Sequence, residues 1–293
     1  MDKMILGTAQ LGMQYGINNC IGKPCIEDAL KILDCAYSNG IRYLDTASVY
    51  GNSEEIIGMY IKNTGNKFKI CTKFPINVDE YNIEGYYKQS IGKLYINGLY
   101  VYYLHRFEQC KIMGILKKLI LLKEKGVVEN IGVSLYEPEE LLYIIKNLSG
   151  IIDIVQLPFN LLDNKRWIQN DLLEMAKEKE IDIYVRSIFL QGLLLCHKDS
   201  LICREKNITS QIKELNTVAE SLGYSMAQLA VNYVCSFDGI KKYLAGCETY
   251  GQLKENIDIC LSIRKLDKDI CNEIQKISST ASRQVIDPRK WDS

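Results

Sequence analysis

The amino-acid sequence predicts an α/β protein, a (β/α)8 TIM barrel built from one domain. Short apolar segments alternate with longer amphipathic segments along the whole chain, and eight such pairs can be traced. The 293 residues are enough for this fold, which needs about 250. A doubly wound sheet is the alternative, but it favours a GxGxxG loop after the first strand, where this chain has GTAQLG.

The predicted strands are apolar runs that several times end directly before a polar residue. We place them, in chain order, at residues 4–9, 41–47, 67–74, 99–105, 127–134, 152–159, 181–187 and 243–247.

The predicted helices carry local start and stop signals. Gly40 ends the first, Ser53 is the expected N-cap of the second, and Pro138 lies at the start of a later one. Ser225 and Gln228 form a capping-box pattern, after a long polar loop at 196–207. The helices are expected at 27–40, 53–63, 83–96, up to about 125, 138–148, 167–179, 208–221, 225–235, 249–263 and 266–278.

Composition excludes several classes of function. Lys plus Arg equals Asp plus Glu, at 36 each, so neither nucleic acid nor an anionic membrane is indicated as a partner. No apolar run reaches the roughly 18 residues of a membrane span, and the N-terminus is broken by glycine too early for a signal peptide. Eleven cysteines without a CxxC pair predict reduced thiols and a cytoplasmic location. Two histidines without ligand spacing predict no metal site.

Four polar residues at or just after three predicted strands indicate the chemistry. They are Asp45, Tyr50, Lys73 and His105. In a parallel barrel, the carboxyl ends of all strands open onto one face, so these side chains are expected to meet there. A tyrosine has a pKa near 10, and a neighbouring ammonium is expected to lower it. Lys73 would need a carboxylate partner, which Asp45 supplies, and His105 is expected to donate a hydrogen bond to the substrate oxygen. This set predicts proton delivery to a carbonyl oxygen.

The chain resembles the aldo-keto reductase family over residues 7–256. The matching segments are GTAQLG, YLDTASVYGNSEEIIG, CTKF, YLHR, IGVS, VQLPFNLLD, FLQGLL and LAGCETYGQLKEN. The resemblance implies an NAD(P)H-dependent carbonyl reductase in which Tyr50 is the general acid, supported by Lys73, Asp45 and His105. Because no side chain donates hydride, a nicotinamide cofactor, NADP or NAD, would supply it.

The resemblance also implies a set of cofactor-binding residues. Ser134 and Gln156 would meet the nicotinamide carboxamide, and Glu255 with Asn256 the adenine and ribose end. The full set is Gly7, Thr8, Ser134, Gln156, Arg186, Gly246, Glu248, Thr249, Gln252, Glu255 and Asn256.

Three residues depart from the family's usual pattern. Leu135 follows Ser134 where many members have asparagine. Arg186 stands where many members stack an aromatic ring on the nicotinamide; its plane can stack there, but its charge disfavours the oxidised cofactor. Glu248 lies in the turn where many members hold the 2′-phosphate of NADP with a basic residue. Because a carboxylate repels that phosphate and accepts a hydrogen bond from a ribose hydroxyl, the sequence puts NADP preference in doubt.

The substrate is the least defined part of the prediction. The loops at 12–24 and 193–207 and the C-terminal tail at 279–293, which we expect over the active site, are polar and favour a small carbonyl compound, a sugar derivative among them. Two other functions stay open: a cofactor-bound regulatory or binding module with little turnover, and a lyase that uses Lys73 as a Schiff base. The expected assembly is a monomer or a small homo-oligomer.

Overall fold

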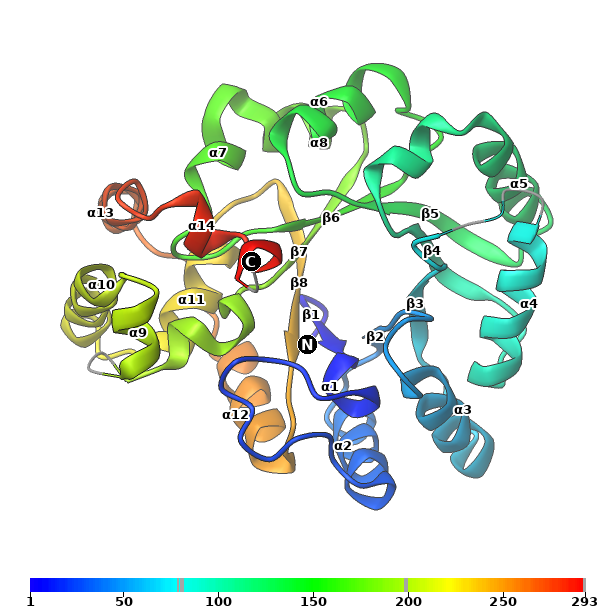
Figure 1. Cartoon of the computed structure of the whole chain (residues 1–293), viewed down its shortest axis with the longest axis horizontal. Coiled ribbons are helices and arrows are strands. Elements are labelled where there is room, and N and C mark those ends of the chain that lie inside the picture. The colour runs from blue at the N-terminus through cyan, green and yellow to red at the C-terminus, as the bar shows by residue number, and fades with distance from the viewer. Residues whose placement is uncertain (78, 80–81, 198–199, 292–293) are drawn as a thin grey trace.

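The computed structural model describes residues 1–77, 79, 82–197 and 200–291 (Figure 1). Residues 198–199 of the predicted polar loop and 292–293 of the tail therefore lie outside the described residues.

Eight parallel strands form a closed barrel in sequence order, so the predicted (β/α)8 fold is confirmed. Figure 1 shows the helices arranged around the outside of these strands. The strands are β1 (Met4–Gly7), β2 (Tyr43–Asp45), β3 (Lys69–Lys73), β4 (Leu99–Leu104), β5 (Val128–Ser134), β6 (Ile154–Pro158), β7 (Asp182–Arg186) and β8 (Ile240–Gly246). The helices are α1 (Ala9–Gly12), α2 (Ile26–Ser38), α3 (Ser53–Thr64), α4 (Ile83–Leu94), α5 (Met113–Glu124), α6 (Pro138–Asn147), α7 (Lys165–Ile168), α8 (Leu172–Glu178), α9 (Leu201–Glu205), α10 (Thr209–Ser221), α11 (Met226–Cys235), α12 (Tyr250–Leu261), α13 (Lys268–Ser278) and α14 (Arg283–Ile286).

Some predicted element boundaries were wrong. The single helix expected at 167–179 is divided into α7 and α8, because Asn170 and Asp171 adopt positive φ angles between them. The polar loop expected at 196–207 contains the short helix α9, for which Ser200 is the N-cap. Ser53 is not an N-cap but the first residue of α3; its buried hydroxyl donates to Thr8 instead.

One helix signal is confirmed and a second is confirmed in part. Pro138 is the first residue of α6. The hydroxyl of Ser225 accepts a hydrogen bond from the backbone N–H of Gln228 at the start of α11, but the Gln228 side chain donates to Ser262 instead of completing the predicted capping box. The first N–H groups of a helix have no partner within the helix. Proline lacks such an N–H, and the serine hydroxyl accepts a hydrogen bond from one of them.

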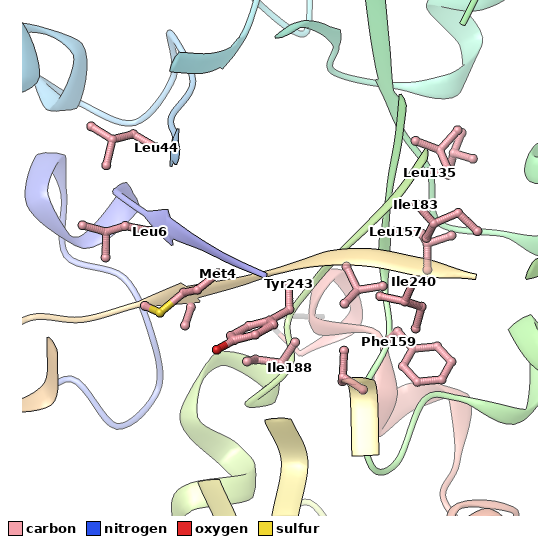
Figure 2. Packing of buried hydrophobic residues seen from close by; sticks show 14 of the residues in the cluster. Met4, Leu6, Leu44, Leu135, Leu157, Phe159, Ile183, Ile188, Ile240 and Tyr243 are labelled. Atoms are coloured by element: carbon pink, nitrogen blue, oxygen red, sulfur yellow. The ribbon is translucent and has the colours of Figure 1, made fainter. Parts of the chain in front are cut away.

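The strands divide their side chains between two apolar clusters, because alternate residues of a strand point to opposite faces. The outer cluster packs the strands against the helices, and Figure 2 shows part of it, with Met4 and Leu6 of β1 near Tyr243 of β8. The inner cluster fills the barrel with Ile5, Cys71, Val101, Tyr103, Ile154, Tyr184 and Leu244. The barrel is therefore a packed core, and in such a barrel the ligand site is expected at the carboxyl ends of the strands.

Candidate active site

The same alternation brings the predicted site residues together. Three site residues lie two positions after a residue of the inner cluster, on the same face of their strands: Lys73 after Cys71, Gln156 after Ile154 and Arg186 after Tyr184. Asp45 directly follows Leu44 of the outer cluster, so its side chain lies on the inner face as well. Each of these residues is the last or the middle residue of its short strand, so their side chains form the layer directly above the packed barrel interior.

A buried ion pair occupies the centre of this layer. The ammonium of Lys73 lies 2.6 Å from Oδ1 of Asp45 and 3.2 Å from the carbonyl oxygen of Thr46. The side chains are only 2% and 4% exposed. The amide of Gln156 donates to the other oxygen of Asp45, Oδ2, over 2.8 Å. Both carboxylate oxygens are therefore satisfied, as a buried charge requires.

The charge of Lys73 is fixed by this arrangement. Burial by itself lowers the pKa of the ammonium, but Asp45 and Tyr50 act in the opposite direction, and the pKa is raised overall. Lys73 is thus a permanent cation at neutral pH.

Tyr50 is held against this cation by its loop. The ring centre of Tyr50 lies 5.4 Å from the Lys73 ammonium. The loop packs on α1 so closely that a Cβ added to Gly12 would lie 1.9 Å from the Tyr50 carbonyl oxygen. Gly51, at φ +56°, faces the Gly12 carbonyl in the same way, with 2.2 Å left for a Cβ. Two glycines therefore set the position of the tyrosine.

Burial outweighs the effect of the Lys73 ammonium, which lowers the pKa of Tyr50 as expected. Burial raises the pKa, the Lys73 ammonium opposes it, and the charge of Asp45 raises it again, so the pKa lies above its usual value of 10. The phenol is therefore protonated across the physiological range and is available as a proton donor.

His105 directly follows β4. Its Nδ1 lies 3.3 Å from the carbonyl oxygen of Phe74, to which it donates in the tautomer that carries its hydrogen on Nδ1. Burial and the charge of Lys73 lower the pKa of His105 from 6.5 to about 4. The ring is therefore neutral at physiological pH, and the hydrogen bond from His105 to the substrate oxygen stays a prediction.

This lowered pKa predicts a pH-dependent contribution to stability. The native state disfavours the charged imidazole. The contribution of neutral His105 to the free energy of unfolding is therefore fully present above pH 6.5 and declines as the pH falls toward 4. The maximum loss corresponds to about 3 kcal/mol. Urea unfolding of wild type and His105→Gln between pH 7.5 and 4.5 should show that the variant loses less stability on acidification. If the free energy of unfolding falls equally with pH in the two proteins, His105 is not the residue responsible for the loss.

A cavity of about 430 Å³ extends from Tyr50 to the N-terminus of α12. Most of the predicted cofactor-binding residues line it: Gly7, Thr8, Gln156, Arg186, Gly246, Glu248, Gln252, Glu255 and Asn256. Asp45 and Tyr50 line it as well, whereas Lys73, His105, Ser134 and Thr249 are not among the lining residues. Ser134 is paired in register with Gln156 but is buried.

Several of these side chains are already engaged within the protein. The Thr8 hydroxyl donates to the Asp45 carbonyl oxygen, and the Gln252 side chain accepts from the Glu248 backbone N–H. The amide of Asn256 donates to the Gly246 carbonyl oxygen over 3.3 Å. Thr249 caps α12 by accepting from the N–H of Gln252, as predicted.

The cavity has the composition that a dinucleotide needs. Gly7 and Gly246, which are paired in register, line it without side chains, and the space beside Gly246 is occupied by the polar side chain of Gln10, another lining residue. The far end of the cavity is the N-terminus of α12, where the positive end of the helix dipole favours phosphate. Carboxylates at Glu248 and Glu255 can accept from ribose hydroxyls. The residues therefore fit a nicotinamide dinucleotide.

Two chain segments meet across this cavity in contacts that the sequence did not reveal. The backbone N–H of Ile17 donates to the Gln191 carbonyl oxygen over 3.0 Å, and the Asn18 amide donates to the Gly192 carbonyl oxygen over 2.8 Å. Tyr15, Asn18 and Gln191 all line the cavity. Because the partners are about 174 positions apart, no local pattern could have identified them.

The C-terminal tail is attached beside the same end of the barrel. Arg283 forms an ion pair of 2.6 Å with Glu137 at the start of α6. The guanidinium of Arg289 lies 3.7 Å from the ring centre of Tyr136, and that of Arg186 lies 4.2 Å from the same ring. The tail thus reaches the residues next to the cavity through Tyr136.

In the described part of the chain, no helix is both long enough and apolar enough to span a membrane. Within these residues, no three histidine, cysteine, aspartate or glutamate side chains are grouped to hold a metal ion.

Comparison with known proteins identifies relatives over nearly the whole chain. The model of the Aldo/keto reductase family matches residues 3–279. An uncharacterized oxidoreductase of Bacillus subtilis, YqkF, is 27% identical, covering 92% of this chain and 94% of its own. D-arabinose 1-dehydrogenase of Saccharomyces cerevisiae is 32% identical, covering 62% of this chain and 59% of its own.

The fold is also found in solved structures. The holo form of the aldo-keto reductase AKR11C1 from Bacillus halodurans superposes with a TM-score of 0.77 and is 20% identical. The match covers 97% of this chain and 95% of that one, which supports the same barrel architecture.

Proposed function

Since this chain belongs to the aldo/keto reductase family and is an NAD(P)-dependent oxidoreductase acting on small carbonyl compounds, we propose that Tyr50 protonates the carbonyl oxygen. The cavity residues would hold a nicotinamide dinucleotide, which would supply the hydride for the carbonyl carbon. The Tyr50 hydroxyl gives its proton to the oxygen, so that an alcohol forms and the phenolate remains beside Lys73. The ammonium of Lys73 stabilises that phenolate, and Asp45 keeps the ammonium charged and in place.

The observation that carries this proposal is the placement of Tyr50 over a buried cation. The Lys73 ammonium lies 5.4 Å from the tyrosine ring and is anchored by Asp45. An anion forming on the tyrosine therefore meets a positive charge in a water-poor site, where electrostatic interactions are strongest.

The same placement disfavours a lyase that uses Lys73 as a Schiff base. Such an amine must be neutral to attack a carbonyl, whereas the pKa of Lys73 is raised and its nitrogen is engaged by Asp45 and Thr46. Borohydride trapping of a substrate adduct on Lys73 would reverse this conclusion.

NAD(P)H consumption tests the proposal directly. Aldehydes, ketones and sugars are offered to the protein with NADH and NADPH, and oxidation of the cofactor is followed by its absorbance. Steady consumption with at least one carbonyl compound supports the reductase. Tight cofactor binding without consumption would instead favour the regulatory or binding module.

We further propose that a sugar derivative is the physiological substrate. The loops beside the cavity present polar side chains, Asn18, Gln191 and Tyr15 among them, which suit hydroxyl groups. One relative, named a D-arabinose 1-dehydrogenase, acts on a sugar according to that name.

We expect NADH to bind more tightly than NADPH. Half-buried Glu248 and exposed Glu255 line the far end of the cavity, and Arg186, which lies near Tyr50, is the only cation among the described lining residues. The carboxylates of Glu248 and Glu255 would repel the 2′-phosphate of NADPH. Glu248→Gln should therefore improve NADPH binding relative to NADH by about 5-fold, measured by fluorescence titration. Glu174→Gln, an exposed change on α8, serves as the control. Equal or better catalytic efficiency of the wild type with NADPH would end this proposal.

A further inference from the structure

Arg186 is the one cation among the described residues that line the cavity. It lies at the carboxyl end of β7, half-buried, in the same wall as Gln156 and Tyr50. Its positive charge acts on both Tyr50 and His105: it partly opposes the burial that raises the pKa of Tyr50 and adds to the burial that lowers the pKa of His105.

The partners of Arg186 leave most of its hydrogen-bonding capacity free. One face of the guanidinium covers the Tyr136 ring at 4.2 Å, and Nη2 donates to the Leu135 carbonyl oxygen over 3.1 Å. A guanidinium has five N–H donors, so the donors along its other edges are open to a ligand.

Arg186 also has no anionic partner in the described chain within the 4.0 Å that defines an ion pair. Three other arginines beside this end of the barrel have carboxylate partners: Arg166 pairs with Asp163, Arg283 with Glu137 and Arg289 with Asp287. The carboxylate nearest the reacting end of the cavity, Asp45, is neutralised by Lys73. An uncompensated guanidinium in a partly buried wall favours an anionic ligand, because the ligand replaces the water that burial removes.

We propose that Arg186 binds an anionic oxygen group, a carboxylate or a phosphate, carried by the carbonyl substrate. This inference rests on the proposed reductase function and specifies the class of substrate. The planar fork of arginine matches two oxygens of such a group, which fixes the orientation of the carbonyl toward Tyr50 as well as adding affinity.

Matched pairs of substrates test the inference. Glyoxylate and succinic semialdehyde are compared with their methyl esters, and glyceraldehyde 3-phosphate with glyceraldehyde. Wild type should prefer the charged member of at least one pair in kcat/KM. Arg186→Gln should reduce that preference by roughly 10- to 100-fold, and Arg186→Lys by less, since it keeps the charge but not the fork. The carboxylate and phosphate pairs show which anion is preferred.

The ratio within each pair separates this role from other effects of the substitution. If Arg186 acts only on the cofactor or on folding, both members of a pair lose activity equally and the ratio is unchanged, which would overturn the proposal. Arg42→Gln is the matched control, because Arg42 also covers a tyrosine ring at 4.2 Å and donates to backbone carbonyl oxygens but does not line the cavity. Its ratios should equal those of wild type.

A binding measurement distinguishes failure of this inference from failure of the reductase proposal. Succinate and succinamide, which contain no aldehyde, are titrated into the cofactor-loaded protein by calorimetry. Preference for succinate in wild type, lost in Arg186→Gln, supports the anion site even if no aldehyde is reduced. If neither the substrate pairs nor this titration shows a preference for the anion that depends on Arg186, the inference is wrong.

Discussion

Replacing Tyr50 by phenylalanine should lower kcat by about 10²- to 10⁴-fold, the usual contribution of a general acid. The substitution removes only the hydroxyl, and the ring keeps its place over the Lys73 ammonium at 5.4 Å. The dissociation constant for the dinucleotide, measured by fluorescence titration, should remain close to that of wild type. Stopped-flow measurement of cofactor oxidation would show the loss in the chemical step itself.

Two further tyrosine variants make this result specific. Tyr143→Phe removes a hydroxyl from the surface of α6 and should behave like wild type. Tyr15→Phe removes one from the cavity wall itself and should have a far smaller effect than Tyr50→Phe. Turnover at the wild-type rate in Tyr50→Phe would refute the role of this residue.

Replacing Asp45 by asparagine should destabilise the protein by about 3–5 kcal/mol, because it leaves the Lys73 ammonium buried without its anion. The side chains are 2% and 4% exposed, so water cannot take the place of the lost carboxylate. Urea unfolding at pH 7, followed by circular dichroism, measures the free energy of unfolding.

The double variant Asp45→Asn with Lys73→Met tests the physical cause. It removes both charges and should be more stable than either single variant, although it lacks activity. Glu174→Gln breaks an exposed pair with Lys177, whose side chains are both 54% exposed, and should change stability by no more than about 1 kcal/mol. An equal loss of unfolding free energy in Glu174→Gln and Asp45→Asn would contradict the proposed cost of leaving Lys73 buried without its anion.

Much of this architecture is predictable from the sequence because it follows from short-range patterns. The alternation of strands and helices predicts the barrel, and the geometry of a parallel barrel predicts that Asp45 and Lys73 meet although they are 28 residues apart. The N-cap at Thr249 and the proline at the start of α6 are local signals, and both were found where expected.

The remaining features depend on contacts that have no local signal. Gln156 was predicted from the family resemblance to meet the cofactor, and nothing in the sequence indicated that its amide donates to Asp45, 111 positions away. The Nδ1 of His105 lies beside the carbonyl oxygen of Phe74, an atom that every residue carries and no sequence pattern marks. Ser53 looked like a cap because its residue type is common there, but the approach of Thr8 gave its hydroxyl a different partner.

The close packing of Gly12 and Gly51 beside Tyr50 has a consequence for anyone who wishes to redesign this enzyme. The backbone beside Tyr50 occupies the space that side chains at positions 12 and 51 would need, so a single added methyl group at either position displaces the tyrosine. Gly22, in the same N-terminal stretch, has nothing within 4 Å of an added Cβ, although its φ of +81° still favours glycine. Mutant libraries that aim at new substrates should therefore leave positions 12 and 51 fixed and place their diversity further along the loop.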